Sequence, residues 1–199
     1  MTNNHAQLNV LLLAGGKSSR MGGEDKALIE YQGKPMIEHL IEQLPMSDIH
    51  QLVISCNRNH EQYSHYSEHL VSDKSYEEIE AFAGPLLGVL SAMETYPADA
   101  WLVLPCDTPQ LNIALITKLI DDYKNGSSLI SCLSIGERIQ PLHCVLSSQL
   151  KDSLFDYLKS GNRRAQEWVM LQNPNTIDCS NQADKLANIN SPSDLLEPR

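Results

Sequence analysis

Residues Leu11–Leu28 read LLLAGGKSSRMGGEDKAL, an apolar strand that runs into a loop rich in glycines and cations. The twelve residues after Ala14 hold four glycines and three cations, namely Gly15, Gly16, Gly22, Gly23, Lys17, Arg20 and Lys26. Glycines let backbone N–H groups approach an anion closely, and the cations neutralise its charge. The pattern therefore favours a phosphate-binding loop. An ordinary strand-to-helix turn with solvated charges stays open as the alternative.

Two common nucleotide-binding motifs do not fit this loop. A Walker A motif has a glycine, then four residues of any type, then a Gly-Lys pair. In this chain Leu11 stands at the position of that first glycine, five residues before Gly16-Lys17. The dinucleotide fingerprint GxGxxG is also missing, because Gly15-Gly16 continues directly into Lys17. The sequence thus predicts a different kind of phosphate loop.

Outside the loop, apolar runs of strand length alternate with stretches of helical periodicity. We expect strands at Leu8–Leu13, Leu52–Cys56, Leu70–Ser72, Trp101–Leu104, Leu129–Leu133, Leu142–Leu146 and Thr176–Asp178. We expect helices at Met36–Leu44, Pro85–Tyr96, Ile113–Tyr123, Ser148–Lys159 and Arg164–Leu171. Alternation of this kind is typical of the α/β class, with a mostly parallel sheet and helices on both faces. We predict one Rossmann-like domain over residues 1–199.

Composition excludes several classes of protein. Fifteen Lys and Arg stand against 25 Asp and Glu, which gives a net charge of −10, and the longest basic run is the pair Arg163-Arg164. Generic binding to nucleic acid or to an anionic membrane is therefore not expected. The first residues, MTNNHAQ, lack the pattern of a signal peptide. Five cysteines without CxxC spacing favour a reduced, cytoplasmic protein.

The second chemical signal is the stretch Trp101–Pro109, WLVLPCDTP, in which a buried strand ends and presents Asp107. In an open α/β sheet, ligands bind beyond the carboxyl ends of the strands, so Asp107 is expected to face the glycine loop. Mg²⁺ typically takes one or two carboxylates together with phosphate oxygens and water. Asp107 is thus a candidate metal ligand. Two alternatives stay open: a cap for a helix that starts near Leu111, or an Asx turn.

Weaker signals lie elsewhere in the chain. The stretch Gly84–Gly88, GPLLG, opens a helix whose free N–H groups suit a phosphate or another polar ligand, and Asp73 follows a predicted strand. His60, His65 and His69 are interpreted as part of a solvated surface helix rather than a metal site, and His143 as a core residue. No Ser/His/Asp or Cys/His arrangement supports a covalent acyl mechanism.

Four motifs together resemble a known family. They are LAGGKSSRMGGEDKAL, GPLLG, PCDTP and the later LANINSP, and they span nearly the whole chain in the family's order. They resemble nucleotidyltransferases with the nucleotide-diphospho-sugar transferase fold, and in particular the molybdenum cofactor guanylyltransferase family. This resemblance implies that the protein joins GMP from GTP to the phosphate of Mo-molybdopterin and releases pyrophosphate, with Mg²⁺ as cofactor. It also implies partner proteins that deliver molybdopterin and receive the finished cofactor.

The resemblance also implies roles for residues at the matching positions. The nucleotide would be bound by Leu13, Ala14, Gly15, Lys26, Asn57, Asp73 and Asp107. The catalytic group would comprise Arg20 and Lys26 on the phosphates and Asp107 on Mg²⁺. The pterin or phosphate side would include Gly84, Gly88, Asn188 and Asn190, with the two glycines shaping the pocket floor.

One position departs from the family pattern. Relatives often carry Asn-x-Asn-Arg in the second strand, whereas this chain reads Ser55-Cys56-Asn57-Arg58. Ser55 is shorter than the asparagine associated with guanine binding, although its hydroxyl can still donate or accept a hydrogen bond. Asn57 keeps its match.

Two rival functions stay open. One is another nucleotidyltransferase of the same fold, such as a molybdopterin cytidylyltransferase or a sugar-phosphate enzyme. Cytidylyltransferases typically read LAAG in place of Leu13–Gly16 and a GDxP-like motif in place of Pro105–Asp107, so both differences favour GTP. The other rival is a nucleotide-binding or cofactor-carrier module without turnover. The absence of a nucleophile fits the transferase, because a substrate phosphate ionised at neutral pH needs no strong general base.

Overall fold

A central strand, β1 (Leu8–Leu13), organises the fold, and all six of its residues are buried. The computed structural model describes residues 6–15, 25–80, 83–191 and 193–194. β1 pairs in parallel with β4 (Gln51–Ser55) on one side and with β6 (Ala100–Pro105) on the other. Its apolar run is therefore explained by burial on both faces of the sheet, as expected for a parallel strand between helices.

Seven strands make up the sheet, in the order β5-β4-β1-β6-β8-β7-β9. The other strands are β5 (His69–Val71), β7 (Ile130–Ile135), β8 (Arg138–Ser147) and β9 (Asn175–Asp178), with β5 and β9 at the edges. Four of the six strand pairs are parallel, and only β8 runs antiparallel to its two neighbours. The predicted mostly parallel sheet is confirmed. The predicted strand at Leu142–Leu146 is longer than expected because β7 and β8 form a hairpin.

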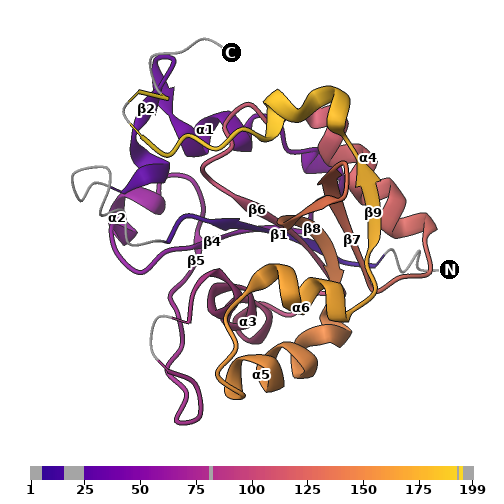
Figure 1. The fold of residues 1–199 in the computed structure, drawn as a ribbon. Helices are drawn as coiled ribbons and strands as arrows, with labels where there is room; N and C mark the ends of the chain where they lie inside the picture. The colour runs from indigo at the N-terminus through magenta and orange to yellow at the C-terminus, as the bar shows by residue number, and fades with distance from the viewer. Residues whose placement is uncertain (1–5, 16–24, 81–82, 192, 195–199) are drawn as a thin grey trace, which may run out of the picture.

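Helices cover both faces of the sheet (Figure 1). α3 (Pro85–Thr95), α5 (Lys151–Lys159) and α6 (Ala165–Leu171) pack on one face, and α1 (Met36–Ile41) and α4 (Ile113–Asn125) pack on the other. Each face has its own buried apolar cluster, one containing Leu12 and Leu119 and the other containing Leu11 and Trp101. The predicted α/β class with helices on both faces is confirmed. The extent of the domain over residues 1–199 stays a prediction.

Several short elements complete the fold. They are α2 (His60–Tyr63), the hairpin of β2 (Glu30–Tyr31) and β3 (Lys34–Pro35), and the 3-10 turns Lys26–Leu28, Met46–Asp48, Ser148–Leu150 and Ser180–Leu186. The hairpin matters for the site because buried Tyr31 packs with Met36 and Ile189 in a third apolar cluster. This cluster holds the segment around Ile189, near the end of the chain, against the first half of the chain.

Within the described residues, no helix has the length and apolar character needed to cross a membrane. All five cysteines are buried free thiols: Cys56, Cys106, Cys132, Cys144 and Cys179.

Candidate functional site

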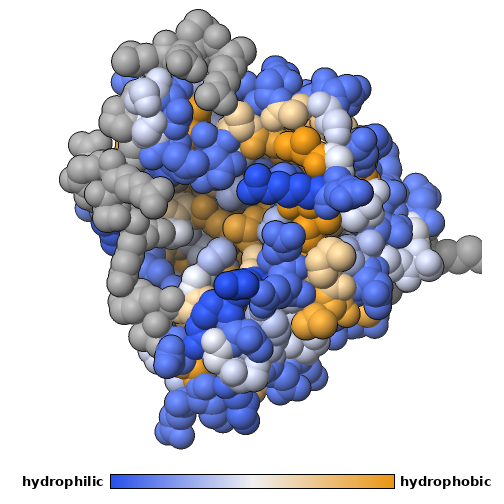
Figure 2. Space-filling model, in the orientation of Figure 1, coloured by the Kyte–Doolittle hydropathy of each residue, from blue (hydrophilic) through white to orange (hydrophobic). Residues whose placement is uncertain are grey.

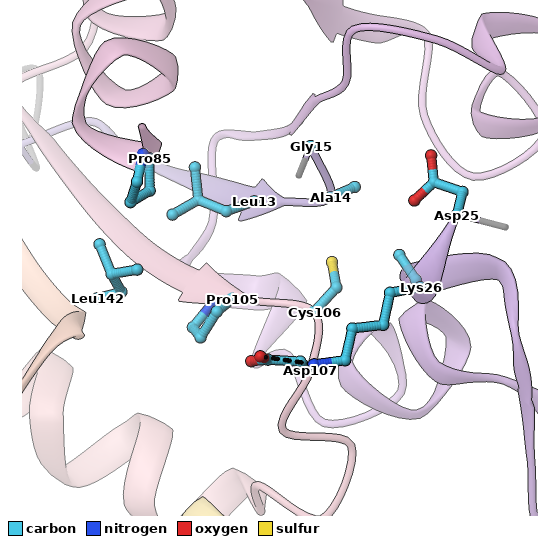
Figure 3. Close-up of a pocket in the computed structure, with 11 residues that line it drawn as sticks. Leu13, Ala14, Gly15, Asp25, Lys26, Pro85, Pro105, Cys106, Asp107 and Leu142 are labelled. Carbon is cyan, nitrogen blue, oxygen red and sulfur yellow. Dashed lines mark hydrogen bonds and ion pairs between the residues drawn. The ribbon is translucent and has the colours of Figure 1, made fainter. Parts of the chain in front are cut away.

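A pocket of about 270 Å³ lies at the carboxyl ends of β1 and β6. Figure 2 shows a hollow on this face of the molecule with hydrophobic side chains inside it and hydrophilic side chains around it. The described residues that line the pocket are Leu13, Ala14, Gly15, Asp25, Lys26, Ala27, Pro85, Pro105, Cys106, Asp107 and Leu142 (Figure 3). Five residues predicted to bind the nucleotide are thus brought together here, namely Leu13, Ala14, Gly15, Lys26 and Asp107.

The main polar contact of the pocket joins Lys26 to Asp107. Lys26 begins a 3-10 turn at the end of the glycine loop, and Asp107 follows the last residue of β6 by two positions. Lys26 Nζ donates to Asp107 Oδ2 across 2.9 Å, as the dashed line in Figure 3 shows. Both side chains are about one-fifth exposed (21% and 23%), so a ligand in the pocket can reach this ion pair.

Asn188 and Asn190 complete the polar cluster. Asn188 Nδ2 donates to Asp107 Oδ2 over 3.1 Å, and Lys26 Nζ donates to Asn190 Oδ1 over 2.7 Å. Between them, the Ile189 N–H donates to the Asp107 carbonyl oxygen over 2.8 Å, and its side chain packs into the Tyr31 cluster. Because side chains alternate along an extended segment, seating Ile189 inward turns both asparagines toward the site.

Asp107 does not cap a helix. α4 begins at Ile113, and its cap is Asn112, whose side chain accepts a hydrogen bond from the Leu115 N–H over 3.0 Å. The alternative role of Asp107 as a cap for a helix near Leu111 is therefore wrong. Within the described residues, Asp107 Oδ1 is buried without a hydrogen-bond partner, and an unpaired buried carboxylate oxygen is energetically costly.

The residues around Asp107 limit how a metal could be held there. Among the described residues, no group of three or more His, Cys, Asp or Glu side chains is arranged to bind a metal ion. A cation at Asp107 could take phosphate oxygens of a bound substrate and water as further ligands. That ligand set is the one Mg²⁺ commonly uses with nucleotides.

On the β4 side of the pocket, main-chain groups fix the start of the glycine loop. The N–H groups of Ala14 and Gly15 both donate to the Ser55 carbonyl oxygen, over 3.0 Å and 2.9 Å. Ser55 itself is buried, and its side chain faces Gly88 of α3. Ser55 therefore supports the loop through its carbonyl, and its hydroxyl is not among the described groups that line the pocket.

Asn57 and Asp73 form a reciprocal pair next to this loop. Asn57 Nδ2 donates to Asp73 Oδ2, and the Asp73 N–H donates to Asn57 Oδ1, both over 2.8 Å. Burial raises the pKa of the Asp73 carboxyl, and the hydrogen bond from Asn57 partly opposes that rise. A Cβ built on Gly15 would lie 3.6 Å from Asn57 Nδ2, so the pair adjoins the loop.

The two glycines of GPLLG are not among the described residues that line the pocket. Pro85, between them, lines it instead. Gly84 has φ +81° and precedes α3, a conformation that L residues rarely adopt. A Cβ on Gly88 would lie only 2.6 Å from Ser55 Oγ, so Gly88 allows α3 to pack closely on β4. A direct ligand contact for either glycine stays a prediction.

Six lining residues were not predicted as site residues from the sequence, namely Asp25, Ala27, Pro85, Pro105, Cys106 and Leu142. Asp25 lines the pocket, and its buried carboxylate accepts a hydrogen bond from Asn59 Nδ2 over 3.4 Å and lies 3.6 Å from Arg58 Nε. The only sequence feature that pointed to Asp25 was its position directly before Lys26. Cys106 also lines the pocket, and burial, followed by nearby Asp107, raises its pKa well above the ordinary value. A raised pKa disfavours the thiolate, which is the reactive form of a cysteine.

The remaining predicted residues have mixed outcomes. Arg20 lies outside the described residues, as do Lys17 and Gly16. The expected surface helix over the three histidines is wrong: α2 ends at Tyr63, and His69 lies in β5. His143 is buried as predicted, and its Nε2 lies 3.0 Å from Thr108 Oγ1.

Comparison with known proteins identifies the family. A family model described as a MobA-like NTP transferase domain matches residues 10–175. A molybdenum cofactor guanylyltransferase from Ectopseudomonas mendocina (strain ymp) is 39% identical over 188 residues, 94% of this chain and 89% of that protein. Another from Haemophilus influenzae is 37% identical over 188 residues, 94% of this chain and 95% of that protein. The chain belongs to the molybdenum cofactor guanylyltransferase family. The resemblance seen in the sequence and the prediction of a nucleotidyltransferase are thereby confirmed.

Solved structures agree on the fold. Molybdopterin-guanine dinucleotide biosynthesis protein A from Archaeoglobus fulgidus superposes with a TM-score of 0.75 at 20% identity, over 94% of this chain and 95% of that one. A CMP:2-keto-3-deoxy-manno-octonic acid synthetase complexed with CTP gives a TM-score of 0.73 at 13% identity, over 96% of both chains. At these identities the likeness shows the nucleotide-diphospho-sugar transferase fold and nothing finer.

Proposed function

We propose that the protein transfers GMP from GTP to the terminal phosphate of Mo-molybdopterin and releases pyrophosphate. The observation that carries this proposal is the cluster of Lys26, Asp107, Asn188 and Asn190 at one end of the pocket, in a chain of the guanylyltransferase family. The cluster combines a cation for phosphates, a carboxylate for a metal and two amides that can orient a phosphate. This set of groups suits a phosphate-to-phosphate transfer.

The proposed chemistry needs positioning rather than a nucleophile from the protein. An ionised oxygen of the pterin phosphate attacks the α-phosphorus of GTP, a new P–O–P bond forms, and the bond to the β-phosphate breaks with loss of pyrophosphate. The Lys26 ammonium offsets the charge that builds up on the phosphates. Arg20 would share that task. Asn188 and Asn190 would hold the attacking phosphate in line. The protonated Cys106 takes no covalent part.

Asp107 would hold Mg²⁺, which supplies charge neutralisation on the nucleotide phosphates when bound. Two observations support this assignment: the partnerless buried Oδ1 and the location of the carboxylate within the pocket. Lys26 occupies the other oxygen, Oδ2. The carboxylate thus has one oxygen for a metal while the second one stays in the hydrogen-bond network.

For the nucleoside, we propose the loop of Leu13, Ala14 and Gly15 together with the Asn57–Asp73 pair. The guanine base carries two N–H donor groups on one edge, and a fixed carboxylate is a suitable acceptor for them. Asn57 holds Asp73 by two hydrogen bonds: its Nδ2 donates to the carboxylate, and its Oδ1 accepts from the Asp73 main-chain N–H. Gly84 and Gly88, proposed for the pterin or phosphate side, would shape the pocket floor through the packing of α3.

The test is pyrophosphate release with Mo-molybdopterin as acceptor and either GTP or CTP as donor. We expect release with GTP, with CTP at least about tenfold less efficient because a pyrimidine lacks the two-donor edge. Preference for CTP would replace the guanylyl assignment with the cytidylyl one. GTP binding without pyrophosphate release at saturating Mg²⁺ would favour the carrier function.

We further propose that the enzyme works in the reducing cytoplasm, together with proteins that supply molybdopterin and accept the finished cofactor. The five buried free thiols support a reducing compartment. Retention of activity at millimolar thiol concentrations, with copurification of molybdenum enzymes or of molybdopterin-synthesising proteins, would test both points.

A further inference from the structure

Thr108 and His143 form a buried polar contact directly beneath the turn that presents Asp107. Thr108 is fully buried and His143 is 3% exposed, and neither lines the pocket. Thr108 Oγ1 lies 3.0 Å from His143 Nε2 and 3.3 Å from the Pro105 carbonyl oxygen. His143 lies in β8, and Thr108 lies three residues after β6 ends at Pro105, so the contact ties the Asp107 turn to the strand beside β6.

Apart from the contacts of the Asp107 carboxylate itself, three contacts among the described residues join the turn to other segments of the chain. The Cys106 N–H donates to the Leu13 carbonyl oxygen over 3.2 Å, the Asp107 carbonyl accepts from the Ile189 N–H over 2.8 Å, and Thr108 meets His143. The first two are main-chain contacts. Only the Thr108–His143 tie joins two side chains, so a substitution can remove it without changing a main-chain group.

The carboxylate depends on these ties because its own contacts are few. Among the described residues, Asp107 Oδ2 accepts from Lys26 and Asn188, and Oδ1 has no partner. When Lys26 turns to a phosphate and Oδ1 meets a metal, as the proposed function requires, Asn188 is the described side chain that stays hydrogen-bonded to the carboxylate. The direction of the carboxylate is then set mainly by the backbone of its turn, and therefore by what anchors the turn.

His143 is suited to this task in its neutral form. Burial lowers its pKa to about 4, against a smaller opposing pull from the Asp107 carboxylate. A neutral imidazole can either accept from the Thr108 hydroxyl or donate to it, and in the second case the hydroxyl is free to donate to Pro105. Both tautomers therefore satisfy the contact without a buried charge.

We propose that Thr108 and His143 are positioning residues that hold the Asp107 carboxylate in place for GMP transfer. This inference rests on the proposed function for its catalytic consequence. Neither residue touches a substrate, and the pair acts through the main chain of the Pro105–Thr108 turn. Displacement of a reacting group by about 1 Å can cost on the order of a hundredfold in rate, so loss of the tie should be visible in turnover.

The test compares Thr108→Val, which keeps the shape and removes the hydroxyl, with Thr108→Ser, which keeps the hydroxyl. We expect Thr108→Val to lower kcat for pyrophosphate release at least about tenfold and to change KM for GTP less than about threefold. Thr108→Ser should stay within about threefold of the wild type in kcat. Val145→Ala, a truncation in the buried part of β8 away from the turn, controls for general loss of stability and should keep normal kcat.

A second readout does not depend on turnover. In a crystal structure of Thr108→Val, we expect the Asp107 carboxylate to move relative to Asn188, and in Thr108→Ser to keep the 3.1 Å contact. A wild type that releases no pyrophosphate would contradict the proposed function and leave this structural comparison decisive for the pair. An unmoved carboxylate with wild-type kcat in Thr108→Val would overturn the positioning role, and so would a Thr108→Ser variant as impaired as Thr108→Val.

Discussion

Lys26 Nζ lies 2.9 Å from Asp107 Oδ2, although the two residues are 81 positions apart in the sequence. The contact joins the end of the glycine loop after β1 to the turn after β6, because β1 and β6 are parallel neighbours in the sheet. Carboxyl ends of parallel neighbours meet at one edge, so a cation and a carboxylate that follow these strands become partners. The site is thus a consequence of strand order.

This ion pair makes a prediction for metal binding. The Lys26 ammonium occupies one oxygen of the proposed metal ligand and repels a second cation. Lys26→Met should therefore tighten Mn²⁺ binding to the nucleotide-free protein by at least about threefold, while it weakens GTP binding. Electron paramagnetic resonance of free Mn²⁺ measures the first effect, and calorimetry measures the second.

The control for this experiment is Lys124→Met, which removes a surface lysine paired with Asp48 at 3.0 Å, far from the pocket. It should leave both affinities unchanged. Unchanged or weaker Mn²⁺ binding in Lys26→Met would show that the ammonium does not oppose the metal.

The cap of α4 gives a prediction about stability alone. Asn112→Ala removes the acceptor for the Leu115 N–H and should lower the free energy of unfolding by about 1 kcal/mol. Pyrophosphate release should stay within about twofold of the wild type, because Asn112 is not a pocket residue. Urea unfolding and the activity assay on the same preparation check both parts. A large loss of activity in this variant would mean that the cap also shapes the site.

The close packing of α3 on β4 can be tested by substitution of Gly88. A Cβ at this position would stand 2.6 Å from Ser55 Oγ, so Gly88→Ala should cost about 1–3 kcal/mol of stability through overpacking. Ser55→Ala removes the clashing atom. The double variant should then be within about 1 kcal/mol of Ser55→Ala in urea unfolding. Equal destabilisation with and without Ser55→Ala would place the strain elsewhere.

The burial of His143 should make the free energy of unfolding depend on pH. Its pKa is about 4 in the folded protein and about 6.5 when unfolded, so between these values only the unfolded chain binds the proton. Protonation then favours unfolding, and the free energy of unfolding should fall as pH drops from 6.5 toward 4, by up to about 3 kcal/mol from this group. His143→Leu should show a shallower fall over the same range, measured by urea unfolding. Parallel pH profiles for the two proteins would refute the assignment.

The site could be predicted from the sequence only where it follows strand ends. Lys26 and Asp107 follow buried apolar runs, so the parallel-sheet rule already places them at one edge. Asn188 and Asn190 were indicated by family resemblance alone. These asparagines lie at the site because Ile189, between them, packs against Tyr31 and Met36. Tyr31 belongs to a hairpin of two-residue strands, which are too short to show a periodic pattern in the sequence. The Thr108–His143 contact likewise depends on β8, which runs antiparallel beside β6. The alternation of apolar runs in the sequence does not predict whether a strand runs parallel or antiparallel to its neighbour.

The start of α4 shows another limit of the sequence pattern. The apolar stripe from Ile113 predicted the helix at its correct first residue, but the cap considered was Asp107, whereas the structure uses Asn112. The cap is the residue that directly precedes the first turn of the helix with an extended backbone. Asn112 is that residue, with φ −110° and ψ 159°, and this frees Asp107 for the pocket.

The proposed role of the Asp107 carboxylate, beside Lys26, is to promote GMP transfer by holding a metal on the nucleotide. Its most direct test is pyrophosphate release from GTP and Mo-molybdopterin by wild type and Asp107→Asn over a range of Mg²⁺ concentrations. Asparagine keeps the shape and loses the charge. We predict a fall in turnover of at least about a hundredfold, about 3 kcal/mol, with a raised Mg²⁺ requirement and an unchanged melting temperature of the free protein. An active Asp107→Asn variant with the Mg²⁺ dependence of the wild type would show that Asp107 does not hold a metal for GMP transfer.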